Sequence, residues 1–289
     1  MIRRAAGATN HRLDRSSWNL AFEPWRRHPI SEQLHCFHDT LASAAYSDHM
    51  IRDHRPYYVK RLIHFFEIWY ARRFVLPHFA AIGEHFMMLK PWCIDIHGAH
   101  ITAGENLHLV TAVDRRISFC TWQFEAHQGQ IQLGDHVLVC PGVRIDSASS
   151  IVIGSNTMLA AGCYISDADW HDIIDRTQTI GTTKPVSIGN NVWLGDGVTV
   201  CKGVSIGDNT VVGTRSVVTG DLPSNVIAAG NPARVIRELS NPEDIVTRST
   251  LFSDPDALAK KNADIDRYFL TGNSTLHWLR TIFAPKRGD

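Results

Sequence analysis

Hydrophobic residues recur every six positions through the middle of this chain. In the clearest stretch, residues 186–222, the recurring aliphatic residues are Ile188, Leu194, Val200, Ile206, Val212 and Val218. Each is followed by glycine, cysteine or threonine, and a second, mostly apolar position lies four residues further on. An α-helix repeats every 3.6 residues and a strand every two, so neither alone explains a period of six.

A six-residue unit fits one short strand followed by one turn, because glycine, asparagine and aspartate tolerate the backbone conformations that tight turns need. Three such units close one triangular coil, and a stack of coils buries the aliphatic positions along its axis. The pattern therefore predicts a mainly β protein, a parallel β-helix of hexapeptide repeats over residues 91–239.

The repeat is less regular toward the start of this region. It is present at Leu133, Val139 and Ile145 and resumes two residues late at Ile153, which predicts a bulged turn within the sequence "DSASS". Further upstream the spacing of six is kept, with poor turn residues, by Ile101, Leu107, Val113 and Phe119. We expect an irregular opening of the stack there.

One long insertion interrupts the repeat. Ile165 and Ile188 are 23 residues apart instead of six, and the intervening stretch begins "SDADWHDIIDR". A stack of coils accommodates such an insertion only as a loop that leaves one corner. The sequence predicts a protruding loop over residues 166–187, with His171 as its only histidine.

The flanking regions have helical patterns. Residues 31–90 are predicted to be helical, with apolar residues at helical spacing on one side of residues 57–76 and basic residues on the other. This segment either packs on the stack or lies on a membrane surface. Residues 240–289 form the other flank, where Asp254, Pro255 and Gly272 delimit one helix and Ser274 caps another. The expected organisation is a helical region 1–90, the β-helix 91–239 and a helical tail 240–289.

Composition narrows the functional class. Of 289 residues 44% are hydrophobic, and 29 basic residues balance 29 acidic ones, whereas nucleic-acid binding is usually accompanied by a basic excess. Six cysteines without a CxxC pair are typical of reduced thiols in a cytoplasmic protein. The first residues lack the apolar core of a secretory signal, and no apolar run reaches 18 residues. We expect a cytoplasmic protein, or one peripheral at the inner face of the membrane through residues 57–76.

Residues 186–239 closely resemble the hexapeptide-repeat acyltransferases, in the branch of the maltose, galactoside and nodulation-factor O-acetyltransferases. The resemblance rests on the coils around "IGNNVWLGDG" and on the closing motif "GNPARVIREL". It implies a left-handed coil, a homotrimer, and acetyl-CoA or another acyl-CoA bound between neighbouring prisms. It also implies transfer to a hydroxyl of a sugar or of a saccharide-containing acceptor, without a metal ion. If residues 57–76 lie on a membrane surface, a lipid-linked saccharide is the favoured acceptor.

The resemblance assigns six positions to acyl-CoA binding: Trp193, Asp196, Thr214, Thr219, Arg234 and Arg237. Guanidinium groups bind phosphates in a forked geometry, so Arg234 and Arg237 are assigned to the phosphates of CoA. Their alternative role is a solvated start of a helix. Where the family usually has a lysine after the threonine, this chain has Gly220.

The resemblance also suggests residues at the reacting end. Its catalytic histidine corresponds to His171, and its acceptor-binding aspartate to Asp146. An imidazole titrates near neutral pH and suits a general base. Three nearby carboxylates could orient the ring: Asp167, Asp169 and Asp172. This loop lacks the family's usual Gly-His-Pro, and an alignment without a gap would place Asp169 at the catalytic position.

Two other functions share the same coil. A metalloenzyme similar to the γ-class carbonic anhydrases needs three histidines around zinc, and the candidates in the irregular opening are His97, His100, His127 and His136. A non-catalytic scaffold would be expected to lack the loop histidine, which this chain retains. The acyltransferase is therefore the preferred hypothesis.

Overall fold

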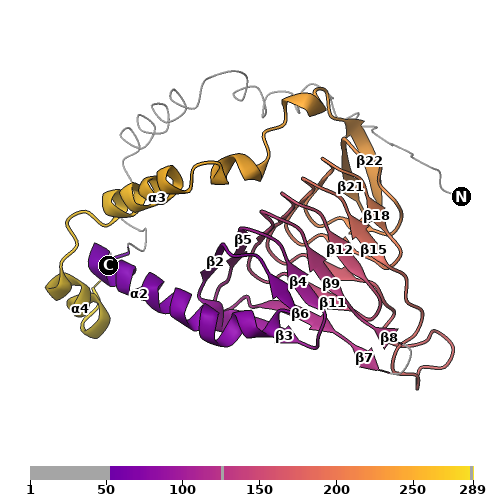
Figure 1. The fold of residues 1–289 in the computed structure, drawn as a ribbon, viewed down its shortest axis with the longest axis horizontal. Helices are drawn as coiled ribbons and strands as arrows, with labels where there is room; N and C mark the ends of the chain where they lie inside the picture. The colour runs from indigo at the N-terminus through magenta and orange to yellow at the C-terminus, as the bar shows by residue number, and fades with distance from the viewer. Residues whose placement is uncertain (1–52, 125–126, 287–288) are drawn as a thin grey trace, which may run out of the picture. The chain divides into compact units, whose positions relative to one another are not determined.

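Three sheets of short parallel strands stack into triangular coils in the computed structural model, which describes residues 53–124, 127–286 and 289 (Figure 1). The chain visits the three sheets in turn, so sequence neighbours lie in different sheets and residues one coil apart form hydrogen-bonded pairs. Residues Asp53–Phe283 form one compact unit, which is described here. The predicted fold class, a parallel β-helix with flanking helices, is confirmed, and its topology is consistent with the left-handed coil of the family.

The first sheet contains β1 (Ala81–Ile82), β4 (Ile101–Ala103), β9 (Ile131–Leu133), β12 (Ile151–Ile153), β15 (Val186–Ile188) and β18 (Ser205–Ile206). The second contains β2 (Phe86–Leu89), β5 (Leu107–Val110), β10 (Leu138–Val139), β13 (Met158–Leu159), β16 (Trp193–Leu194), β19 (Val211–Val212), β21 (Val226–Gly230) and β22 (Ala233–Glu238). The third contains β3 (Ile94–His97), β6 (Ile117–Thr121), β11 (Arg144–Ser147), β14 (Tyr164–Ser166), β17 (Thr199–Val200) and β20 (Val217–Val218). All pairs are parallel except β21–β22, which closes the second sheet as a hairpin.

The six-residue repeat forms the core as predicted. The aliphatic residues of the regular coils, from Ile145 to Val218, are all nearly inaccessible to solvent. Each lies in register with its counterparts one coil away, as Ile188 does with Ile153 and Ile206. Val113 is an exception, being exposed in the turn between β5 and β6, while Ile117 and Phe119 of β6 fill the core.

Asparagines form the turns at one corner of the prism. Asn156, Asn191, Asn209 and Asn225 stand between the first and second sheets with φ of 55–64°. Asparagine adopts this left-handed conformation more readily than most residues. The side-chain amide of Asn191 donates to Asn209 (2.9 Å), and that of Asn209 donates to Asn225 (2.8 Å), which ties successive coils together.

The stack begins earlier than the sequence predicted. Residues 81–89, assigned to the helical region, form β1 and β2 and pair with the next coil. Ile82, Met88 and Ile94 continue the spacing of six, so the prediction of helix over these residues is wrong. Residues 31–52 of that predicted region lie outside the described residues.

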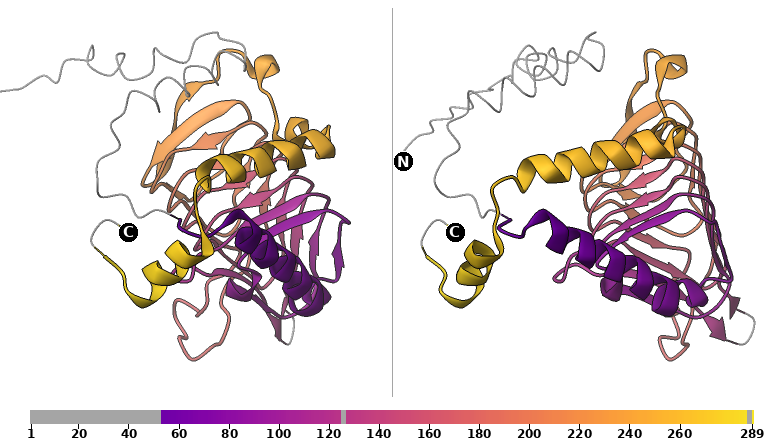
Figure 2. Two further views of the ribbon diagram at one scale, coloured as in Figure 1. Left: turned by 90° about the vertical axis from the view of Figure 1, so that its left-hand side faces the viewer. Right: turned by 60° about the vertical axis from the view of Figure 1, so that its left-hand side comes forward.

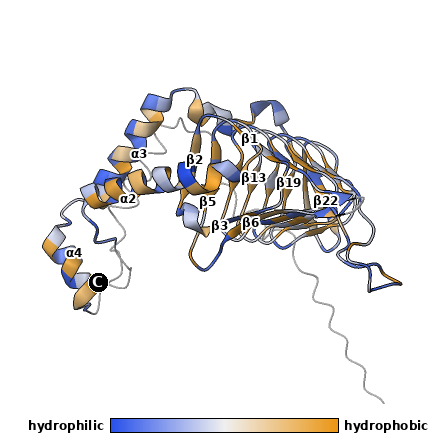
Figure 3. Cartoon of the chain, turned by 60° about the horizontal axis from the view of Figure 1, so that its bottom comes forward, coloured by the Kyte–Doolittle hydropathy of each residue, from blue (hydrophilic) through white to orange (hydrophobic). Residues whose placement is uncertain are grey.

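Helices flank the stack on the N-terminal side. Helix α2 (Tyr57–Tyr70) continues through a π-helical turn, η2 (Ala71–Val75), and a 3₁₀ turn, η3 (Leu76–His78), and η4 (Pro91–Cys93) is a further short turn. Glu67, Ala71 and Val75 are buried, and the Glu67 carboxylate accepts the backbone N–H of Lys90 (2.8 Å). Hydrophobic and hydrophilic residues alternate along α2 (Figure 3), and Leu62, Phe65 and Trp69 among the hydrophobic and aromatic ones are exposed. The segment packs on the first coils, one of the two arrangements predicted, through the side that carries Glu67, Ala71 and Val75.

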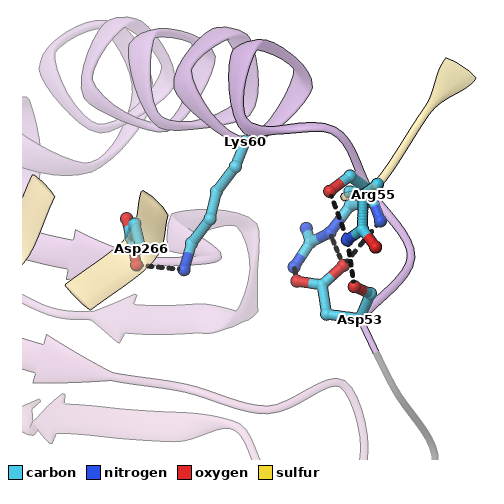
Figure 4. A network of polar contacts seen from close by, with 5 residues as sticks. Asp53, Arg55, Lys60 and Asp266 are labelled. Atoms are coloured by element: carbon cyan, nitrogen blue, oxygen red, sulfur yellow. Dashed lines mark hydrogen bonds and ion pairs between the residues drawn. The ribbon is translucent and has the colours of Figure 1, made fainter. Parts of the chain in front are cut away.

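The tail follows its predicted signals. After η5 (Pro242–Asp244) and η6 (Arg248–Phe252) come α3 (Pro255–Phe269) and α4 (Thr275–Phe283). Asp254 caps α3 by accepting the N–H of Ala257 (2.9 Å), and Ser274 caps α4. Lys60 of α2 pairs with Asp266 of α3 at 2.5 Å (Figure 4). Helix α3 of the tail thus contacts the helix that precedes the stack.

Candidate active site

A long loop, Asp167–Pro185, leaves the prism at the corner between the third and first sheets, between β14 and β15 (Figure 2). Its two ends run antiparallel to each other. The N–H of Lys184 donates to Asp167 O (2.9 Å), Asp169 N–H to Thr182 O (3.0 Å), and Gly181 N–H to Asp169 O (2.8 Å). These bonds confirm a protruding loop and show that its base is ordered.

Asp167 anchors this loop to the coil beneath it. Its side chain is fully buried and accepts three hydrogen bonds, from the Ser147 hydroxyl (2.6 Å) and the N–H groups of Ala148 (2.7 Å) and Ser149 (3.0 Å). These donors belong to the "DSASS" bulge. The two extra residues predicted there thus form the turn that receives the loop's carboxylate.

His171 lies near the start of the loop and is exposed. Its Nδ1 is 3.3 Å from the carbonyl oxygen of Gln178, across the loop. A carbonyl oxygen can only accept, so the neutral imidazole that makes this bond holds its proton on Nδ1 and leaves Nε2 as an acceptor. The imidazole is thus oriented by a backbone group.

The three carboxylates proposed to orient the ring have other partners. Asp167 is bound to the bulge, and Asp169 lies 2.6 Å from the ammonium of Lys202 on the next coil. Asp172 accepts the N–H groups of Asp175 and Ile174, which lower the pKa of its carboxyl. The hypothesis that one of these carboxylates orients His171 receives no support from these contacts.

Aromatic residues line the base of the loop. Trp170 donates its indole N–H to the hydroxyl of Tyr164 (3.1 Å), and its ring centroid is 5.7 Å from that of Trp122. Trp122 immediately precedes the short hairpin of β7 (Gln123–Phe124) and β8 (His127–Gln128) at the same corner. The guanidinium of Arg144 stands over the Tyr164 ring at 5.3 Å. Two coils thus contribute the aromatic wall of Trp122, Tyr164 and Trp170, and the coil between them contributes Arg144.

Asp146 belongs to the same face. It is 2% exposed, and its Oδ2 is 2.6 Å from Nε of Arg144, whose own side chain is largely exposed. In register beside it lie Cys120 and Ser166, at the start of the loop. The structure therefore brings Asp146 and the loop of His171 to one corner.

Three of the predicted acyl-CoA positions, Trp193, Asp196 and Thr214, lie elsewhere on the prism. Asp196 and Thr214 occupy successive turns at the corner between the second and third sheets, where Asp196 accepts the N–H of Ala161 (3.1 Å). Trp193 is about half exposed on the second sheet. One prism thus carries His171 at one corner and these turn residues at another.

The remaining predicted positions are exposed near the end of the stack. Arg234 and Arg237 lie on strand β22, so the alternative of a solvated helix start is wrong. Thr219 follows β20 at the corner that also bears the loop. A Cβ added to Gly220 would meet no atom within 4 Å, so the missing lysine leaves open space.

The described part of the stack contains free cysteines and the histidines that were considered as zinc ligands. Cys93, Cys120, Cys140, Cys163 and Cys201 are free thiols, and burial raises the pKa of Cys163 to about 12. His136 stacks on Phe252 with centroids 5.0 Å apart. In the described part of the chain, none of the four histidines considered for zinc belongs to a group of three potential ligands within 4.8 Å.

Known proteins share these coils. The family model "Bacterial transferase hexapeptide (six repeats)" matches residues 185–220. The "Putative colanic acid biosynthesis acetyltransferase WcaF" of Escherichia coli K12 is 41% identical over 172 residues, which are 60% of this chain and 86% of that relative. The chain belongs to the hexapeptide-repeat acetyltransferases. The family predicted from residues 186–239 is thereby confirmed.

Other members of the family extend the comparison. The galactoside O-acetyltransferase of Escherichia coli K12 is 43% identical over 166 residues, 56% of this chain and 66% of that protein. A "Probable acetyltransferase" of Mycobacterium tuberculosis is 32% identical over 228 residues, 75% of this chain and 67% of that protein. This hexapeptide-repeat acetyltransferase spans 60–67% of the length of the first curated relatives that it matches.

Three partners in the site were absent from the sequence interpretation: Ser147, Gln178 and Lys202. Ser147 lies within the two-residue irregularity, a signal that could have identified its turn. Gln178 acts through its backbone carbonyl, which any residue possesses, so side-chain chemistry gave no signal. Lys202 occupies a corner one coil beyond the loop, and only the stacking register brings it to Asp169.

Proposed function

We propose that this chain transfers an acetyl group from acetyl-CoA to a hydroxyl of a saccharide acceptor, with His171 as the general base. The observation that carries the proposal is the bond from His171 Nδ1 to Gln178 O (3.3 Å), which leaves Nε2 available to take a proton. His171 lies in the one long insertion of a scaffold shared with acetyltransferases.

The proposed reaction needs one proton relay. As the acceptor hydroxyl oxygen attacks the thioester carbon, Nε2 removes the hydroxyl proton. The tetrahedral intermediate then collapses, the C–S bond breaks, and the proton passes from Nε2 to the departing CoA sulfur. The ester product and free CoA account for all atoms, and a backbone N–H would stabilise the oxyanion.

Asp169 is the rival base, and its contacts oppose that role. Its carboxylate is held 2.6 Å from the Lys202 ammonium on the next coil and is therefore engaged in an ion pair. The ion pair directs the carboxylate toward the next coil, where it has a structural partner. We assign Asp169 to holding the loop base against the next coil.

The donor site is proposed to lie between prisms of a homotrimer. Trp193, Asp196, Thr214, Thr219, Arg234 and Arg237 are retained as its candidate residues. Because Asp196 and Thr214 stand at a different corner from His171, a second prism would bring another subunit's turns toward the loop. The exposed Arg234 and Arg237 would bind the CoA phosphates.

The acceptor is proposed to bind beside the aromatic wall of Trp122, Tyr164 and Trp170. Asp146 retains its proposed acceptor role, but its carboxylate is covered by Arg144. The exposed Arg144 guanidinium would therefore contact the acceptor, and Asp146 would orient that guanidinium. The names of the relatives, which refer to colanic acid biosynthesis and to a galactoside, support a saccharide.

Release of free CoA from acetyl-CoA, followed across a panel of free and lipid-linked saccharides, tests the activity. His171→Ala should lower kcat about 10²- to 10⁴-fold and leave the KM for acetyl-CoA nearly unchanged. Asp169→Asn is the matched control and should retain most turnover. If Asp169→Asn is inactive and His171→Ala is active, the assignment of the base is wrong.

The proposed homotrimer is tested by light scattering of the purified protein, which should give a mass of three times 32.4 kDa.

A further inference from the structure

Helix α2 presents a row of apolar side chains to solvent. Leu62, Phe65 and Trp69 are 63%, 71% and 49% exposed, and Tyr58, one turn earlier, is half exposed, with its hydroxyl 2.6 Å from that of Thr275 in α4. Their spacing of four, three and four residues places all four on one side of the helix. We call these four residues the aromatic stripe. Monomeric surfaces rarely leave such large apolar side chains contiguous without a binding role.

The opposite side of α2 already supplies the contacts that hold the helix in place. There Glu67 accepts the N–H of Lys90, while Ala71 and Val75 of the following turn are part of the hydrophobic core. Lys60 pairs with Asp266 of α3. The stripe is therefore not needed to attach this helix to the stack.

Three arginines flank the stripe. At 100° per residue, Arg61 and Arg72 lie beside Phe65, and Arg73 follows Trp69 by four positions. None of the three forms an ion pair within the described residues. One surface hollow is lined by two of these arginines and by apolar residues of the helix: Phe65, Ile68, Trp69, Arg72 and Arg73. The only carboxylate between residues 57 and 75 is the buried Glu67. The exposed side of α2 is thus apolar and cationic, without an exposed acidic group.

We propose that the aromatic stripe docks into the headgroup region of an anionic phospholipid membrane. Interfacial helices bury leucine and aromatic side chains at the acyl boundary while arginines reach the phosphates. No helix among the described residues has both the length and the hydropathy to cross a bilayer, so the contact would be peripheral. A two-fold contact with a second copy would bring the two sets of arginines together, which is electrostatically unfavourable.

Vesicle flotation of the full-length chain tests this proposal independently of acetyl transfer. The chain should float with vesicles of phosphatidylglycerol and phosphatidylcholine, and much less with phosphatidylcholine alone. Raising the salt from about 0.1 M to about 0.5 M should weaken the binding because it screens the arginine–phosphate attraction. Phe65→Ser combined with Trp69→Ser should lower the affinity at least tenfold. Arg72→Glu combined with Arg73→Glu should have a comparable effect.

Matched controls come from the turn before β6. Val113→Ser removes an equally exposed apolar side chain, and Arg115→Glu reverses an exposed charge, so both should bind vesicles as the unmodified chain does. The stripe variants should keep the unmodified chain's mass in light scattering. Failure of the full chain to bind anionic vesicles, or unchanged binding by the stripe variants, overturns the proposal. A smaller mass for the stripe variants also overturns it, because the stripe would then be a contact between subunits.

Discussion

The hydroxyl of Ser147 donates to the buried carboxylate of Asp167 across 2.6 Å, joining the bulge of one coil to the base of the loop on the next. Both residues stand where the six-residue repeat is broken, at the two-residue insertion and at the long insertion. The two irregularities are therefore one structural feature. The bulge supplies the hydrogen-bond donors that hold Asp167, the first residue of the loop.

Asp167→Ala should destabilise the fold by about 3 kcal/mol, because three buried donors lose their acceptor. It should also lower kcat more than it changes the KM for acetyl-CoA, since the loop carries His171. Urea unfolding at one fixed protein concentration, together with the CoA-release assay, measures both effects. Asp264→Ala removes an exposed carboxylate paired with Arg267 and should cost no more than about 0.5 kcal/mol. Equal stability of the two variants would refute the anchoring role.

Arg234→Ala and Arg237→Ala should each raise the KM for acetyl-CoA about ten- to hundredfold with little change in kcat. Loss of a charge-assisted hydrogen bond costs about 1.5–3 kcal/mol, and a phosphate contact stabilises ground and transition states alike. Steady-state kinetics with varied acetyl-CoA measure this. Gly220→Lys is the complementary change, because the space around Gly220 is open, and it should lower the KM severalfold. Unchanged KM values in both arginine variants would place the nucleotide elsewhere.

Stability should fall between pH 7 and pH 5 because of His108. Burial, reinforced by the positive charge of Arg248, lowers the pKa of its imidazole from 6.5 to about 4. Between these two values the unfolded chain binds a proton that the folded chain does not, so acidification favours unfolding. This group alone should cost about 2 kcal/mol at pH 5. Urea titrations at both pH values should show a correspondingly smaller loss for His108→Gln, and an identical loss in both proteins would exclude His108 as the cause.

The coils could be predicted because their physical rule is local. Each sixth side chain must face the axis, so the period alone identified Ile188, Leu194 and Val200 as core. Where turn residues were poor, the same rule failed. Val113 has the spacing of six but lies in an exposed turn. Ile82 and Met88 also have this spacing, but they follow a helical pattern that was predicted to extend over them.

The site could be predicted only in part, for a different reason. His171 could be proposed because it is the only histidine in the insertion, whereas its hydrogen-bond partner is the carbonyl of Gln178, which depends on the fold of the loop. The amphipathic pattern of α2 was also recognised, but a pattern does not state which side meets the protein. Here the buried side includes Glu67, held by a backbone N–H of a distant turn.

The paired base of the loop separates its tip from the stack. Because Lys184 N–H meets Asp167 O at the point of exit, the chain leaves and re-enters the prism at adjacent positions. The entropy of closing such a loop rises only slowly with its length. The segment between residues 172 and 177 lies beyond both His171 and Gln178 and is accordingly expected to be an exchangeable module: tips of other lengths and chemistry should be tolerated on the same base without redesigning a single coil.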